Sequence, residues 1–164
     1  QASRKRSVLL YLTGGIFLAD NHSPCERSYN MSRIRSGNTK PEEIVRKYLF
    51  SMGLRYRKND RRYPGKPDAV FPKYHTVVFV NGCFWHSHIG CSGFVMPKSN
   101  LVYWVPKLER NRYRDAENIN ILKKLGWRVI VVWECELKKS LCNERLIRLY
   151  EEIINPFFND DCFK

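Results

Sequence analysis

Three stretches of the chain carry apolar residues at the spacing of an amphipathic helix. Thr39 and Glu42 have the spacing of a capping box, and Gly53 can end the helix that begins there. A second helix is expected over 101–125 and a third over 140–154. The inward positions predicted for these last two helices are Leu108, Ile119, Leu122, Leu125, Leu146, Ile147, Tyr150, Ile153 and Ile154.

Two runs of β-branched and apolar residues predict strands buried on both faces, HTVVFV at 75–80 and WRVIVVW at 127–133. Shorter extended segments are expected at 54–57 and 68–71. The order is therefore helix, strands, helix, strand, helix. This order predicts an α/β domain with a mixed central sheet and helices on both faces.

The chain is basic and long enough for a single core. It has 164 residues, of which 43% are hydrophobic, and its 29 Lys and Arg against 16 Asp and Glu give a net charge of +13. Such an excess indicates a polyanionic partner, most often nucleic acid. A surface kept basic only for solubility is the alternative. Basic residues interleaved with aromatic ones over 55–63 favour a nucleic-acid partner over this alternative.

Residues 1–19 look like an extension outside the core. Basic residues at 4–6 precede the apolar stretch 7–19, as in a secretory signal, but Gly14 and Gly15 interrupt it and no clear cleavage site follows. Secretion stays open as an alternative. The stretch is too short to span a bilayer, and no other segment could do so. We expect one domain over 20–164, in a reducing cytosol and with no membrane partner.

Cys83, His88 and Cys91 have a spacing that suits a metal site, C-x4-H-x2-C. Cys135 follows the second apolar strand and is the best fourth ligand. Three thiolates and one imidazole would fill the shell of a structural Zn²⁺ and leave no open position. Buried thiols without metal are the alternative, and His86 could replace His88 as a ligand.

A carboxylate and an imidazole flank the first apolar strand. Asp68 heads the segment GKPDAV at 65–70, and His86 follows the end of the strand at 75–80. Phosphodiester cleavage needs a divalent cation near the phosphate, which a carboxylate can hold, and a base such as imidazole. The ordinary alternatives are a turn residue at Asp68 and a packed histidine at His86.

Two further acids are candidates. Glu42 can serve in the capping box and as a second acid, because the two roles are compatible. Asp115 lies among three arginines of the long helix, and by itself it indicates only a solvated ion pair.

Several motifs together resemble the very-short-patch repair (Vsr) endonucleases, a family of bacterial DNA mismatch nickases. The resemblance covers about residues 20–154. Its motifs are RSYNMSRIRSGNTKPE at 27–42, PGKPDAVF at 64–71, VVFVNGCFWHSH at 77–88, YWVPKLERNRYRD at 103–115 and LGWRVIVVWEC at 125–135.

The resemblance implies a restriction-endonuclease-like fold with a structural zinc site on Cys83, His88, Cys91 and Cys135. It implies that catalytic Mg²⁺ is held by Asp68 and by the backbone carbonyl of Val80. It assigns the base to His86 and supporting roles to Glu42 and Asp115. Asn81 departs from the family, which often has histidine there, so a role for this position in proton transfer is not expected.

The resemblance also implies how DNA is contacted. Side chains matching Phe84, Trp85 and Trp104 would enter the base stack beside a mismatch. On a strand, Phe84 and Trp85 would point in opposite directions, which argues against both being core residues. Phosphate contacts are expected from basic side chains: Arg33, Arg35, Arg57, Lys58 and Arg61.

The function implied is nicking of one strand of duplex DNA at T:G mismatches, which arise when 5-methylcytosine deaminates. Partners would be a cytosine-5 methyltransferase in the same cell and mismatch-repair proteins, and the enzyme would act as a monomer. The alternatives are a zinc-stabilised DNA-binding module without catalysis and an endonuclease of the same fold that acts on unmismatched sites.

Overall fold

The computed structural model describes residues 23–33 and 37–155, and the expected extension at 1–19 lies outside them. From residue 40 onward, the helices and strands follow one another as the hydropathy pattern predicts, whereas the helix over 24–32 was not predicted. They are α2 (Pro24–Ser32), α3 (Lys40–Ser51), β1 (Arg57–Lys58), β2 (Ala69–Phe71), η1 (Pro72–Tyr74), β3 (Thr76–Asn81), α4 (Leu101–Lys124), β4 (Arg128–Trp133), η2 (Glu134–Leu137) and α5 (Cys142–Ile154).

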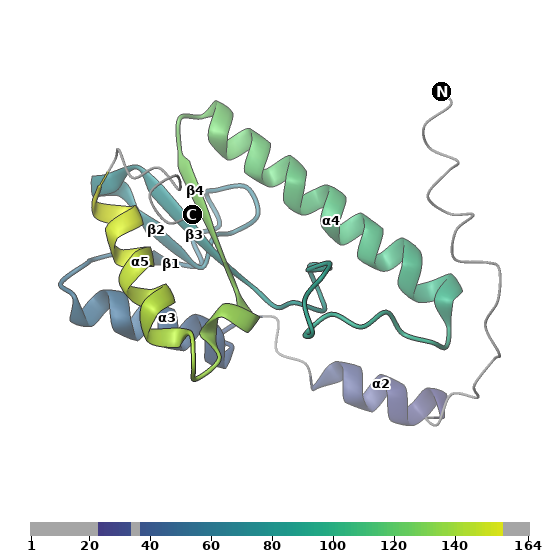
Figure 1. Cartoon of the computed structure of the whole chain (residues 1–164). Helices are drawn as coiled ribbons and strands as arrows, with labels where there is room; N and C mark the ends of the chain where they lie inside the picture. The colour runs from purple at the N-terminus through teal and green to yellow at the C-terminus, as the bar shows by residue number, and fades with distance from the viewer. Residues whose placement is uncertain (1–22, 34–36, 156–164) are drawn as a thin grey trace.

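The four strands form one mixed sheet in the order β1-β2-β3-β4. β1 and β2 are antiparallel, as are β2 and β3, whereas β3 and β4 are parallel and pair from Thr76–Arg128 to Asn81–Trp133. A parallel pair needs a long crossover, and α4 supplies it (Figure 1). The predicted mixed sheet is confirmed.

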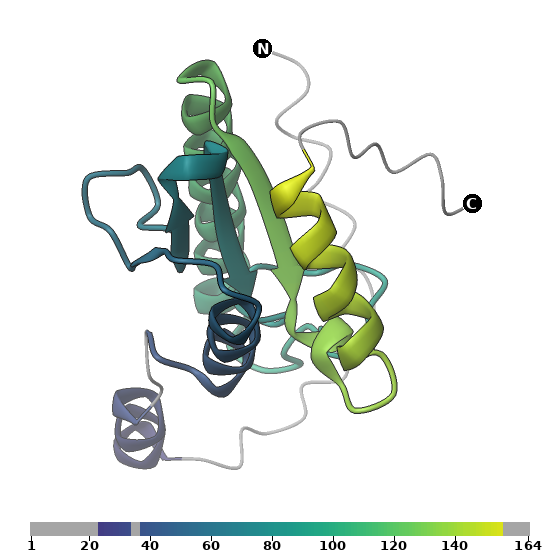
Figure 2. The same cartoon turned by 90° about the vertical axis from the view of Figure 1, so that its left-hand side faces the viewer.

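Helices cover both faces of the sheet, as expected. α4 lies on one face, whereas α3 and α5 lie on the other (Figure 2). The α3–α5 side holds the larger core, in which Val45 and Leu49 meet Val78, Val132 and further apolar residues. The α4 side holds a smaller core of Val70, Val77 and Leu122.

Several details of the predicted core are wrong. β4 is only half-buried, because it is the outermost strand and has a neighbour on one side only among the described residues. Leu125 and Ile147 are exposed, at 59% and 52%, whereas Leu149 of α5 is fully buried although it was not predicted inward. Ile154 is exposed at 38%. The inward stripe of α5 is therefore shifted toward Leu149.

The helix boundaries agree with the local signals. Thr39 precedes α3 as its N-cap, and Gly53 follows that helix with φ +83°. The first short strand lies at Arg57–Lys58, at the end of the segment expected at 54–57. His75 has φ +51° and precedes β3 rather than opening it. Within the described residues, no helix is both long and apolar enough to cross a membrane.

Candidate active site and metal cluster

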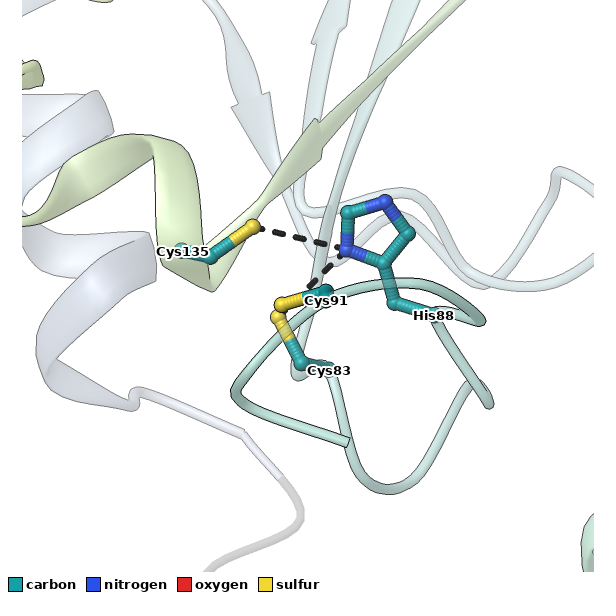
Figure 3. A group of neighbouring side chains, drawn as sticks. All are labelled: Cys83, His88, Cys91 and Cys135. Carbon is teal, nitrogen blue, oxygen red and sulfur yellow. Dashed lines mark hydrogen bonds between the residues drawn. The ribbon is translucent and has the colours of Figure 1, made fainter. Parts of the chain in front are cut away.

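The four predicted metal ligands lie together at one end of the sheet. Their ligand atoms are all within 4.8 Å of one another, and three come from the loop after β3 while Cys135 comes from η2, just past β4 (Figure 3). His88 Nδ1 is 3.7 Å from Cys83 Sγ and 3.4 Å from Cys135 Sγ. The parallel pairing of β3 with β4 brings residues 47 positions apart into this cluster.

The donor set fits a metal such as zinc. Soft thiolates with one imidazole form a closed tetrahedral set. Burial raises the pKa of the Cys135 thiol to about 12, so this thiol keeps its proton unless a cation replaces it. The Trp133 ring stacks on the His88 ring at 4.0 Å between centroids and covers one side of this ligand. The cluster could therefore hold a metal that ties the loop after β3 to η2.

The Asp68 side chain accepts a hydrogen bond from β3 beyond the last residue pair of β2 and β3, where a strand residue would otherwise be the partner. The β2–β3 ladder ends at the Ala69–Val78 pair, and beyond it the Val80 N–H donates to Asp68 Oδ2 at 2.7 Å. Within the described residues, the other oxygen of this carboxylate accepts no hydrogen bond. Since the N–H and C=O of a strand residue face the same edge, we expect the Val80 carbonyl to face Asp68 too.

The surroundings of Asp68 favour the protonated form of its carboxyl group. Burial raises its pKa to about 6, and the negative charge of Glu42 adds to this, whereas the Val80 N–H, Arg46 and His86 act in the opposite direction. The charges of Glu42 and His86 both act on this carboxyl, so the three groups occupy one region. A cation beside Asp68 would stabilise its ionised form.

His86 is held by a carboxylate from the long helix. Its Nδ1 lies 2.6 Å from Asp115 Oδ2, and both side chains are about three-quarters buried, with 28% and 23% exposed. One turn earlier on α4, Asn111 Nδ2 donates to the Trp85 carbonyl at 3.1 Å. α4 therefore forms hydrogen bonds with two consecutive residues of the turn, Trp85 and His86. The bond to Asp115 leaves Nε2 of His86 free to accept a proton.

Glu42 is buried, and both of its oxygens are occupied. It accepts hydrogen bonds from the Asn38 and Thr39 backbone N–H groups, the Thr39 hydroxyl and the Arg46 guanidinium. Burial raises the pKa of Glu42, but these hydrogen bonds outweigh it and the net pKa is lowered. Both carboxylate oxygens of Glu42 are therefore engaged by protein donors, and its ionised form is favoured.

The three predicted wedge residues form one aromatic cluster. The Phe84 ring lies 5.0 Å from the Trp85 ring and 5.3 Å from the Trp104 ring, between centroids. Residues 83–87 are a succession of turns rather than a strand, so the argument from the alternation of side chains along a strand does not apply to Phe84 and Trp85. The Lys107 ammonium lies 5.6 Å from the centroids of both tryptophan rings.

The predicted phosphate contacts are spread over several elements. Arg57 and Lys58 form β1 and are exposed, and Arg61 lies in the loop after it. Arg33 is exposed at the end of α2, with its guanidinium 5.0 Å from the centre of the Tyr29 ring. Arg35 lies outside the described residues.

Comparison with known proteins decides the family. The family model described as DNA mismatch endonuclease Vsr matches residues 19–105. The chain belongs to the Vsr family. The type II nicking enzyme V.NmeAIP of Neisseria meningitidis is 53% identical over 83% of this chain and 97% of its own length. V.XorIIP of Xanthomonas oryzae pv. oryzae, also a type II nicking enzyme, is 51% identical over 85% and 99%.

The DNA mismatch endonuclease Vsr of Escherichia coli is 40% identical over 84% of this chain and 88% of its own length. Membership of the Vsr family supports DNA endonuclease activity. It also agrees with the restriction-endonuclease-like fold that the sequence predicts, since the structure has a mixed four-stranded sheet flanked by helices.

Two residues of this site, Asn111 and Lys107, were not predicted. The sequence does carry a signal for them, because Trp104, Lys107, Asn111 and Asp115 recur at three or four residues along α4 and so share one face. That face is polar and aromatic rather than apolar, which is why a search for inward apolar residues passes over it. Asn81 is 8% exposed and, within the described residues, its side chain has no hydrogen-bond partner.

Proposed function

We propose that this chain nicks one strand of duplex DNA at a T:G mismatch, in a reaction that depends on a divalent cation, Mg²⁺. The observation that supports it most directly is the convergence of Asp68, His86 and Asp115 beside an aromatic cluster. The name of the E. coli relative adds the mismatch, and those of the other relatives add nicking.

Asp68 and the Val80 carbonyl would hold the Mg²⁺, which when bound supplies positive charge to the phosphate. A single carboxylate and one carbonyl suit this ion, because Mg²⁺ usually keeps several waters. Asp115 holds the His86 ring through Nδ1, so that Nε2 accepts the proton of an attacking water. Glu42 stays ionised and adds negative charge near Asp68.

The aromatic cluster of Phe84, Trp85 and Trp104 would separate the base pairs beside the mismatch. A flat apolar surface replaces part of the stacking that it disrupts, and a weakly paired T:G mismatch opens at lower cost. Zn²⁺ in the cysteine–histidine cluster would fix the turn that carries both His86 and this wedge. The mismatch would arise from deaminated 5-methylcytosine, so a cytosine-5 methyltransferase and mismatch-repair proteins would work with this enzyme, which acts as a monomer.

The test is a nicking assay on three duplexes that differ at one base pair: T:G, matched, and another mismatch. We expect one strand of the T:G duplex to be cut with Mg²⁺, and Asp68→Ala to abolish cutting without abolishing binding. Cutting of the matched duplex at an equal rate would favour a nuclease of unmismatched sites. Binding without cutting by the wild-type protein would favour a DNA-binding module.

A further inference from the structure

A second cavity adjoins His86 on the side of α4. Its volume is about 520 Å³. It lies between the β1–β2 loop, the end of β3 and α4, and its polar lining includes Arg61, Lys66, Asn81, His86, Arg114 and Asn118. His86 also lines the cavity that holds Glu42 and Val80. The His86 imidazole therefore lies between two cavities, the one that contains Glu42 and Val80 and the basic one that contains Arg61 and Lys66.

The cations of this cavity are available to an anion. Within the described residues, Arg61 and Lys66 make no side-chain hydrogen bond or ion pair, and Arg114 donates only to the Asn111 amide, at 3.2 Å. The acid in the lining, Asp115, is engaged by His86. The neighbouring Arg62 is different, because Asp60 binds its guanidinium through both carboxylate oxygens. Three cations thus face this cavity, and the carboxylate in its lining is hydrogen-bonded to His86 through one oxygen.

The loop that carries Arg61 and Lys66 has a fixed shape. The Tyr63 ring packs edge-on against Trp127 at 4.8 Å between centroids, and the Lys66 N–H donates to the Tyr63 carbonyl at 3.0 Å. Gly65 has φ +72°, and a Cβ there would lie 3.1 Å from the Asn118 side chain. Glycine therefore allows the loop to press on α4, which holds the cations beside the cavity.

We propose that this basic cavity binds a second phosphodiester of the nicked strand, next to the one that reacts, with Arg61, Lys66 and Arg114 as its cationic groups. The proposal rests on the proposed nicking function and extends the same site. A strand that crosses His86 places its neighbouring phosphates on either side of the imidazole. On one side, the proposed cation and Asp68 meet the reacting phosphate; on the other, three cations and the Asn81 amide meet the next one.

The test combines variants with single neutralised phosphates. T:G duplexes are prepared in which one phosphate beside the nick position is a methylphosphonate, and this position is moved along the strand. Binding is measured by fluorescence anisotropy without Mg²⁺ for the wild type, Arg61→Ala, Lys66→Ala and Lys66→Arg. Arg62→Ala is the matched control, because it removes the same charge from the same loop but from a side chain that Asp60 already pairs.

For the wild type and Arg62→Ala, we expect one neutralised phosphate to weaken binding about tenfold, as the loss of a charged hydrogen bond would. For Lys66→Ala and Arg61→Ala, the same methylphosphonate should weaken binding by less than about twofold, because the cationic side chain that contacts this phosphate has already been removed. Lys66→Arg should restore the sensitivity. Equal sensitivity of the alanine variants and the wild type at every position, or no sensitive phosphate in the wild type, would overturn the site.

Melting curves identify a variant that fails to fold. If Lys66→Ala does not fold, Lys66→Arg is compared with the wild type instead. A folded Lys66→Arg variant that has lost the tenfold sensitivity would refute a role for the positive charge. Nicking of the same duplexes is measured in parallel with Mg²⁺. If the wild type cuts none of them, the proposed function fails, whereas the anisotropy data still decide whether the cavity binds a phosphate.

Discussion

Replacing Asp68 by asparagine should stabilise the protein at neutral pH when no Mg²⁺ is present. Burial raises the pKa of the Asp68 carboxyl to about 6, from 3.8 in an unfolded chain. An asparagine keeps an oxygen that can accept the Val80 N–H, but it carries no charge to be buried. The same substitution should abolish Mg²⁺-dependent nicking, because the carboxylate proposed to hold the cation is lost.

The size of the effect follows from the two pKa values. Between about pH 4 and 6, the folded protein binds a proton that the unfolded chain has released, so the free energy of unfolding falls as the pH rises. A difference of roughly two pKa units corresponds to about 3 kcal/mol at pH 7. This is an upper limit, since solvent reaches part of the carboxyl. Below about pH 3.8 both states are protonated, and wild type and variant should agree.

Denaturant unfolding at pH 4 and pH 7 in magnesium-free buffer measures the difference. Asp60→Asn is the control with the opposite sign, because Arg62 lowers the pKa of Asp60 to about 2 and the charged form of this acid is favoured in the fold. An Asp68→Asn variant that is no more stable than the wild type at pH 7, or equally stabilised at both pH values, would refute the reasoning.

Three further predictions concern the turn after β3 and its partners. Asp115→Asn should lower the nicking rate by about 10² to 10⁴, because the His86 tautomer is no longer fixed, and a melting curve checks that the variant is folded; a rate within a few-fold of the wild type would contradict this. Cys135→Ser should remove bound zinc in metal analysis and lower the melting temperature, and stoichiometric zinc in this variant would disprove the cluster. Asn111→Ala should cost about 1 kcal/mol in chemical denaturation, since the partly buried Trp85 carbonyl loses its donor, and an unchanged midpoint would count against that hydrogen bond.

Apart from α2, the main helices and strands and their order could be predicted because their signals are local. The capping box before α3, the glycines after α3 and α4 and the β-branched runs each act within a few residues. The same signals could not tell that β4 is the outer strand, since an apolar run looks alike in the middle and at the edge of a sheet. The misassignment of Ile147 arose in the same way, because the face of α5 that is buried is set by its packing on α3, far away in sequence.

The part of the site that could be predicted from the residues is the metal cluster, because the sequence spacing of its ligands indicates it. The cluster of Cys83, His88, Cys91 and Cys135 assembled as the sequence indicated. The pairing of His86 with Asp115 was not visible in the residues themselves, because 29 positions separate them and an acid among arginines suggests an ordinary ion pair. The joint packing of the aromatic side chains also escaped prediction, since it depends on the turn that replaces a strand there.

The crossover through α4 has a consequence for synthesis on the ribosome. The Asp115 carboxylate lies on the crossover and the last cysteine of the metal cluster lies beyond it, so the metal cluster cannot be complete before the chain has been made as far as Cys135. A nascent chain that ends within α4 should therefore be inert toward DNA, and a nuclease with this topology acquires its activity only when it is nearly complete. A truncated chain ending at Lys124 that cuts DNA would contradict this expectation.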